Sequence, residues 1–283
     1  LVESLKEEVK GIRPPAGLDV PYFNILLMGP LGSGKSSFCN LMASVFRGGI
    51  SQQAGVGGSS ESSTTTMFTV GDKVSLQLYD TRGIADTDTL DLMQCNYILE
   101  DNVPDFYEMP LASLMSNDDA DFQQRPTLSN KIHCVVFVLD GSTVGDIPTP
   151  VLHKLKWYRD LLNRKGIPQA VLVTQIDKLC DKTAENVCNT FFSPNVQEVI
   201  EKVADLLKFP RNSIWPVKNY EEEVESDESV NILALLAVRQ IMYLAEDYLE
   251  NMKVNKRRRS QRLKTKQAKK AKCERYGSDT ATN

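Results

Sequence analysis

The sequence lacks the usual marks of a zinc-bound, disulfide-held or membrane-spanning protein. Its 283 residues include six cysteines and two histidines, with no CxxC pair and no Cys/His cluster at zinc-ligand spacing. This argues against a zinc site and a disulfide framework, and it favours a reducing compartment. No stretch approaches the roughly 20 apolar residues of a membrane-spanning helix, and no signal peptide opens the chain. We therefore expect a globular, cytoplasmic protein.

Charge is unevenly distributed along this chain of ordinary composition, which has 41% hydrophobic and 25% charged residues. The formal net charge is -4, yet residues 251–283 hold twelve Lys/Arg against two Asp/Glu, a local balance of +10. The other 250 residues therefore carry -14. Such segregation predicts a basic tail that is separate from the main domain.

Apolar runs of strand length alternate with helical patterns. The strand-like runs lie at 22–28, 74–79, 132–139, 170–174 and 213–217, and the helical patterns at about 34–47, 87–99, 150–164, 194–208 and 229–250. Near-continuous apolar strands between helices predict an α/β fold with a mostly parallel sheet and helices on both faces. A further run at 67–70, joined to 74–79 across Gly71-Asp72, predicts a hairpin and one antiparallel edge strand.

Composition divides the chain into three parts. We expect a leading helix and Pro-rich linker at 1–20, a main domain at 21–250 and a basic, disordered tail at 251–283. Residues 101–130 are rich in Pro, Asp and Ser without a clear period, which predicts an insertion in the main domain.

The first strand runs directly into residues 29–36, which match the phosphate-loop pattern GxxxxGK[ST] in full. The glycines allow the backbone amides to approach phosphate oxygens, and the next helix directs its positive N-terminal end at the same anion. Lys35 would reach the β- and γ-phosphates, and the Ser36 hydroxyl would coordinate Mg²⁺. The strand before and the helix after this loop make a P-loop NTPase fold the expectation. The predicted nucleotide contacts here are Gly29, Gly32, Ser33, Gly34, Lys35, Ser36 and Ser37.

The strand at 74–79 leads into Asp80-Thr81-Arg82-Gly83, which fits the DxxG element of GTPases. Asp80 would hold Mg²⁺ through water, and the Gly83 amide would contact the γ-phosphate. A Ser/Thr-rich stretch precedes the strand at 67–70. Its last residue, Thr66, is the first choice for a third Mg²⁺-site residue and Thr65 is the second, although a flexible loop explains the stretch about as well.

Base recognition rests on weaker signals. Thr174, Gln175 and Asp177 stand where GTPases carry [NT]KxD, and Asp177 would accept hydrogen bonds from the guanine ring. Gln175 replaces the usual lysine, whose stem covers the purine, so we expect weaker base affinity and less certain selectivity for GTP over ATP. Asn219 follows the strand at 213–217 and is a further nucleotide-binding candidate by position alone.

Hydrolysis is predicted to be slow. Ile84 follows the DxxG element at the place where Ras-like GTPases have a water-orienting glutamine, and isoleucine offers no hydrogen bond to water. Arg82 is available as an arginine finger, but a solvated arginine is the commoner explanation. No catalytic residue is therefore assigned.

Two segments resemble a known family. Residues 24–38, NILLMGPLGSGKSSF, and residues 131–140, KIHCVVFVLD, are similar to the interferon-induced protein 44 family, as is the later Gly166-Ile167-Pro168-Gln169. The resemblance covers roughly residues 1–250 and implies a cytoplasmic, interferon-inducible, GTP-binding protein of the innate antiviral response. It supports Lys35, Ser36, Asp80, Gly83 and Asp177 as nucleotide-site residues. Longer family members carry a TLDc-type domain upstream, which is missing here, so a truncation or a short paralogue is expected.

Three functions follow from these features. The first is a guanine-nucleotide switch or slow GTPase that uses GTP or GDP with Mg²⁺. The second is a nucleotide-stabilised scaffold that never cycles, with a protein partner and an oligomeric state that the sequence leaves open. The third assigns function to the tail, as an arm for nucleic acid or an anionic membrane, or as a nuclear import signal at 256–259. No aromatic residue interrupts residues 252–274, so stacking on bases is not supported.

Overall fold

The computed structural model describes residues 1–51, 66–71, 73–81, 83–85, 98–100, 127–221 and 223–279. It describes only the backbone at residues 66, 184, 257, 259 and 260 and beyond residue 261. Six strands within these ranges form one sheet in the order β2-β3-β1-β4-β5-β6. The strands are β1 (Phe23–Met28), β2 (Thr66–Thr69), β3 (Leu76–Asp80), β4 (Cys134–Asp140), β5 (Gln169–Thr174) and β6 (Ile214–Pro216). All neighbours pair in parallel except β2, which lies antiparallel to β3 at the edge. The α/β P-loop fold with one antiparallel edge strand is confirmed.

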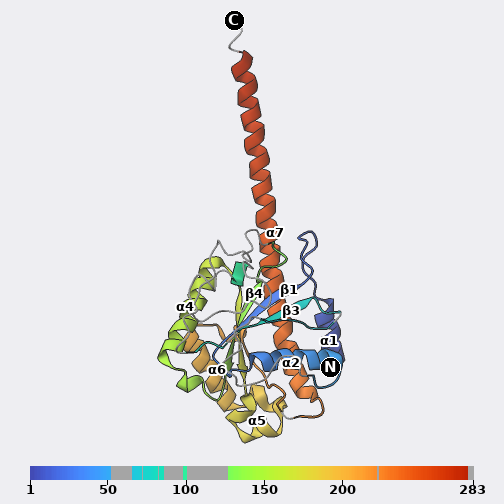
Figure 1. Ribbon diagram of the computed structural model, residues 1–283, viewed down its shortest axis with the longest axis vertical. Helices are drawn as coiled ribbons and strands as arrows, with labels where there is room; N and C mark the ends of the chain where they lie inside the picture. Colours follow the sequence, from blue (N-terminus) through green and yellow to red (C-terminus); the bar gives the residue numbers. More distant parts are fainter. Residues whose placement is uncertain are drawn as a thin grey trace.

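The central strands are apolar along their whole length because both faces of the sheet are covered. Every residue of β1 is buried, and six of the seven in β4 are buried. On one face lie α1 (Val2–Gly11), α2 (Lys35–Arg47) and α7 (Glu228–Asp279), whereas α4 (Thr149–Lys165) and α6 (Pro194–Leu207) lie on the other (Figure 1). Such two-sided cover explains why periodicity of two is absent from these strands.

Short elements complete the chain between β5 and β6. They are η2 (Ile176–Leu179), α5 (Asp181–Glu185), η3 (Val187–Phe192) and η4 (Arg211–Ser213), while η1 (Val144–Asp146) precedes α4. These pieces were not predicted, because single helical turns carry no period long enough to recognise. The predicted helix at 87–99 is seen only at its end, residues 98–100, and the predicted insertion lies outside the described residues up to 126.

The leading helix is part of the main domain. Val9 of α1 is fully buried, and Glu8 accepts hydrogen bonds from Arg239 (2.9 Å) and from the Tyr243 hydroxyl (3.2 Å), both on α7. The predicted helix at the N-terminus is therefore present, and it packs on α7 across more than 200 residues of sequence.

The last helix is much longer than predicted. α7 continues from Glu228 through the basic segment to Asp279, where the sequence had predicted a disordered tail from residue 251. No glycine or proline occurs between Glu228 and Tyr276, and Lys, Arg, Gln and Ala are strong helix formers, so nothing in the chain ends the helix. Beyond the body of the domain the helix projects alone (Figure 1).

The first half of α7 is more apolar than the sequence analysis indicated, since no stretch there was judged long and apolar enough to span a membrane. By length and composition alone, Glu228–Lys256 is apolar enough to cross one. More than half of its most apolar window is buried within the protein, and Ala234, Val238 and Met242 are fully buried in the core. Packing against the sheet accounts for this apolar character.

Candidate nucleotide site

The residues of the phosphate loop lie where β1 ends and α2 begins. Lys35 is buried, and its Nζ donates to the carbonyl oxygens of Gly29 (3.2 Å) and Pro30 (3.0 Å), which belong to the same loop. Burial lowers the pKa of Lys35 to about 8, and the nearby Asp80 carboxylate counteracts part of that shift. The loop thus holds a cation in a site where burial disfavours its charge, and an anion would stabilise it.

Two close approaches require glycine. Gly34 has a φ of +89°, and a side chain there would meet the Asn219 amide nitrogen at 2.8 Å. Gly83 lies against the phosphate loop, and its Cβ would come within 2.4 Å of the Leu31 Cα. The DxxG element is therefore pressed onto the loop that it is predicted to assist.

Asp80 and Ser36 form the predicted metal site. The Ser36 hydroxyl donates to Asp80 Oδ2 at 2.5 Å. The other carboxylate oxygen, Oδ1, is buried and has no hydrogen-bond partner in the described part of the chain. Burial raises the pKa of Asp80, while the Ser36 hydroxyl and the Lys35 ammonium lower it. A buried carboxylate oxygen without a partner beside a hydroxyl fits a hard divalent cation such as Mg²⁺, which prefers oxygen ligands.

Thr66 reaches the same edge by strand pairing. It is the first residue of β2, and its Cα is the register partner of Asp80 on β3. The structure therefore brings Thr66 and Asp80 together at the backbone level, as predicted for a shared metal site. The second choice, Thr65, and the candidate finger Arg82 lie outside the described residues.

The side chains of Thr174 and Asn219 hydrogen-bond to the backbone of the phosphate loop. The Thr174 hydroxyl lies 2.8 Å from the Ser33 carbonyl oxygen and 3.2 Å from that of Leu139, and the Asn219 amide donates to the Gly34 carbonyl at 3.1 Å. Both side chains are buried. They position the loop backbone, which is a role the sequence had not suggested, and their contact with a nucleotide stays a prediction.

The base-reading loop follows β5. Gln175 has a φ of 54°, and its Oε1 accepts a hydrogen bond from Lys178 Nζ at 2.7 Å. Lys178 also pairs with Glu221 at 3.2 Å. Lys178 directly follows Asp177, and from the sequence it is not expected to take the place of the motif lysine without rearrangement; in the structure its ammonium lies beside Gln175 and Glu221.

A second lysine borders this loop. Burial alone would lower the pKa of Lys218, but its ion pair with Glu223 (2.9 Å) and the charge of Asp177 raise it overall. Lys218 therefore lies close enough to Asp177 to respond to its charge. Its position directly after the β6 region was the only available sequence signal for it.

Ile84 has a structural role. Its side chain is buried, its N–H donates to the Gly29 carbonyl at 2.9 Å, and it forms an isolated bridge with Pro30. A glutamine at this position would be buried in the core instead of facing an attacking water. Neither the side chain of Ile84 nor its N–H, which is bonded to the Gly29 carbonyl, is available to orient a water molecule.

The predicted site residues with described positions converge on the edge formed by the carboxyl ends of the parallel strands. They are Gly29, Gly32, Ser33, Gly34, Lys35, Ser36, Ser37, Thr66, Asp80, Gly83, Thr174, Asp177 and Asn219. Ligands of open α/β sheets bind at this edge. Among the residues that the structure describes, no group of three or more His, Cys, Asp or Glu side chains is arranged to hold a metal.

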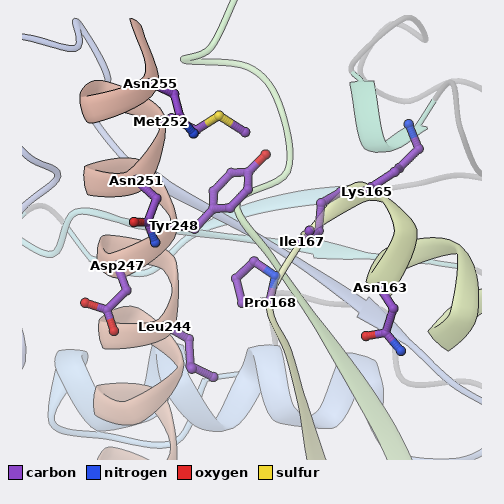
Figure 2. A pocket seen from close by; sticks show the side chains of 11 residues that line it. Asn163, Lys165, Ile167, Pro168, Leu244, Asp247, Tyr248, Asn251, Met252 and Asn255 are labelled. Carbon is purple, nitrogen blue, oxygen red and sulfur yellow. The ribbon is translucent and has the colours of Figure 1, made fainter. Parts of the chain in front are cut away.

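A cavity of about 400 Å³ lies elsewhere, between α7 and the turn that leads into β5 (Figure 2). Pro168 and Leu244 contribute apolar surface, and Tyr248 and Lys165 lie beside them. Because Pro168 stands at the start of β5, this cavity is at the opposite edge of the sheet from the phosphate loop. It is not part of the nucleotide site.

Comparison with curated proteins identifies relatives of the chain. It is 32% identical over 259 residues to human interferon-induced protein 44-like, covering 88% of this chain and 57% of that protein. It is 30% identical over 263 residues to mouse interferon-induced protein 44, covering 90% and 62%. The chain is similar to interferon-induced protein 44 over about nine tenths of its own length. The resemblance predicted from the phosphate loop and the 131–140 segment is confirmed.

The chain spans about three fifths of the length of these relatives. No family model matches it. Among solved structures, a probable GTP-binding protein, EngB, aligns over 79% of this chain and 99% of its own, at 15% identity and a TM-score of 0.44. That likeness is too distant to support a conclusion about function.

Proposed function

We propose that this chain binds a guanine nucleotide with Mg²⁺ and turns it over slowly, as a switch in an interferon-linked antiviral response of the cytoplasm. The observation that carries the proposal is the convergence of Lys35, Ser36 and Asp80, with Asp80 Oδ1 buried and without a partner among the described residues. The names of the relatives support the interferon link. An immunoblot of cells before and after interferon treatment tests that link, and an unchanged protein level contradicts it.

Within this proposal each residue has a physical task. The loop amides and Lys35 hold the β- and γ-phosphates, and Ser36, Asp80 and Thr66 hold Mg²⁺, directly or through water. Bound Mg²⁺ would neutralise charge that develops on the phosphate oxygens. Asp177 would accept hydrogen bonds from guanine, while Lys178 and Lys218 supply positive charge beside it.

Calorimetric titration with GTP, GDP and ATP in the presence of Mg²⁺ tests binding. We expect GTP and GDP to bind more tightly than ATP, and Asp177→Asn to remove that preference. Asp181→Asn is the matched control, because Asp181 is an exposed carboxylate on α5, a few residues further along. Equal affinity for ATP and GTP in the unmodified chain would contradict the assignment of guanine.

Phosphate release tests turnover. Without a water-orienting side chain, we expect a rate on the order of 10⁻⁴ per second. The rate per molecule should stay constant over a broad dilution series, because nothing in the sequence identifies a residue that acts on a second copy. A rate that rises with protein concentration would indicate that another subunit donates the missing group, and a rate near one per second would contradict slow turnover.

A non-cycling scaffold is the second candidate. The contacts of Ile84 favour it, because its N–H donates to the Gly29 carbonyl and its buried side chain offers no hydrogen bond to an attacking water. Nucleotide would then stabilise the domain without being consumed. Tight binding without phosphate release supports the scaffold over the switch.

A further inference from the structure

The second half of α7 takes no part in the nucleotide site. We define the basic arm as residues 253–275, which hold twelve Lys/Arg and one acid, Glu274. The helix leaves the body near the cavity of Figure 2, at the sheet edge opposite the phosphate loop, and projects from there (Figure 1). Leu249 is the last fully buried residue, and Val254, Lys256 and Arg258 are exposed. At about 1.5 Å per residue the arm is roughly 35 Å long.

Repulsion between like charges destabilises the helix of the basic arm. Lys253 and Arg257 stand four residues apart on the helix, as do Arg258 and Arg262, and Lys266 and Lys270. Each like-charge pair at this spacing costs about 0.2–0.5 kcal/mol. Only one acid is available within the arm to offset them. Contact with an external polyanion would remove this repulsion and stabilise the helix of the arm.

The arm lacks the apolar stripe with which a helix inserts into a lipid surface or pairs in a coiled coil. Its two larger apolar residues, Val254 and Leu263, are nine positions apart, which places them on opposite sides of an α-helix. No apolar stripe exists for insertion into the headgroup region, and no a/d heptad exists for a second helix. The partner must therefore be recognised by charge over most of the helix circumference.

Duplex DNA has the matching geometry. The major groove of B-form DNA is about 12 Å wide and admits an α-helix, with a phosphate backbone on each side of it. A-form RNA has a major groove too narrow for a helix. Single strands are held largely by stacking on aromatic side chains, and none occurs between residues 253 and 275. We infer that the basic arm binds duplex DNA through its phosphates and that this contact stabilises its helix.

The net negative charge of residues 1–250 confines the proposed DNA binding to the basic arm. Residues 1–250 carry a formal charge of -14, so the rest of the chain repels a polyanion. The arm and the nucleotide site lie at opposite edges of the sheet, and neither proposal depends on the other.

Fluorescence anisotropy of the full chain with a labelled DNA duplex of about two helical turns tests the inference. Changing Lys256, Arg257, Arg258 and Arg259 together to Gln should weaken binding at least tenfold, because four phosphate contacts are lost. The matched control changes four exposed basic residues of the body, Lys73, Arg164, Lys182 and Lys202, to Gln and removes the same charge. We expect the control to weaken binding less than twofold.

Circular dichroism of the same proteins provides the structural readout. DNA should raise the helical signal of the unmodified chain and of the body variant, but much less that of the arm variant. Equal weakening by the two variants would overturn the inference, as would tighter binding to duplex RNA of the same sequence or to vesicles of phosphatidylcholine and phosphatidylserine. Absence of DNA binding would overturn it directly and would leave the nucleotide titrations unaffected.

Discussion

Positive charge is buried at the carboxyl ends of the parallel strands, in the phosphate loop, and exposed at the opposite end of the sheet, in the basic arm. At the phosphate loop a single lysine is buried, and the backbone of Gly29 and Pro30 holds its ammonium in place. At the other edge the basic arm carries twelve cations, and its described side chains from Val254 onward are exposed. Burying a charge is costly, so the phosphate loop contains a single lysine that is fixed by hydrogen bonds. Exposed charges cost little, so the basic arm can carry many of them and bind through their combined charge.

Salt should separate the two regions most strongly. Between about 50 and 200 mM salt, DNA binding by an arm that makes six to ten phosphate contacts should weaken roughly 10³-fold or more. Nucleotide binding should change only a few-fold, because buried charges are screened much less. Anisotropy and calorimetry over one salt series measure both, and similar slopes would mean that the two regions bind phosphate by the same means.

Lys35→Ala should uncouple the two activities. Removal of the loop cation should weaken GTP binding by about 100-fold, a loss of some 2.7 kcal/mol. DNA binding by the arm should be unchanged, because the arm leaves the domain at the other edge. Calorimetry with GTP and anisotropy with DNA report the two results, and unchanged GTP affinity would refute the nucleotide site.

The same lysine should destabilise the nucleotide-free protein. Its pKa is about 8 in the folded chain against an ordinary value of 10.5, so Lys35→Met should raise the free energy of unfolding at neutral pH by about 3 kcal/mol. Between these two pKa values the unfolded chain binds more protons, and the stability of the unmodified protein therefore rises with pH. Urea unfolding should show the gap between the two proteins closing over that window. A gap that widens instead would contradict the assigned sign.

Gln175→Lys should have the smallest effect. A lysine stem over the purine should tighten GTP and GDP binding by about tenfold, from packing worth ~1 kcal/mol. Because the Lys178 ammonium lies 2.7 Å from Gln175 Oε1, the new charge would be repelled, and the gain should be larger in a Lys178→Gln background. Paired titrations of the single and double variants measure this, and no gain in either would show that the loop does not cover the base.

The sequence predicted where most of the strands lie along the chain because long apolar runs and glycine-rich turns are local signals. β1, β3, β4, β5 and β6 each overlap an expected run, and β2 pairs antiparallel as the Gly71 turn suggested. The single turns between β5 and β6 were missed because they are stabilised by tertiary contacts and have no period of their own.

The site divides in the same way. The sequence by itself determined the phosphate loop, Asp80 and the chemistry expected of them, because such motifs need fixed residue types at fixed spacing. Only the tertiary structure decided that Thr174 and Asn219 hydrogen-bond to the backbone of the phosphate loop. It also decided that Ile84 is buried, and that α7 runs on past the core into the basic arm. Those outcomes depend on contacts between residues far apart in the chain and on the absence of any residue that would end the helix.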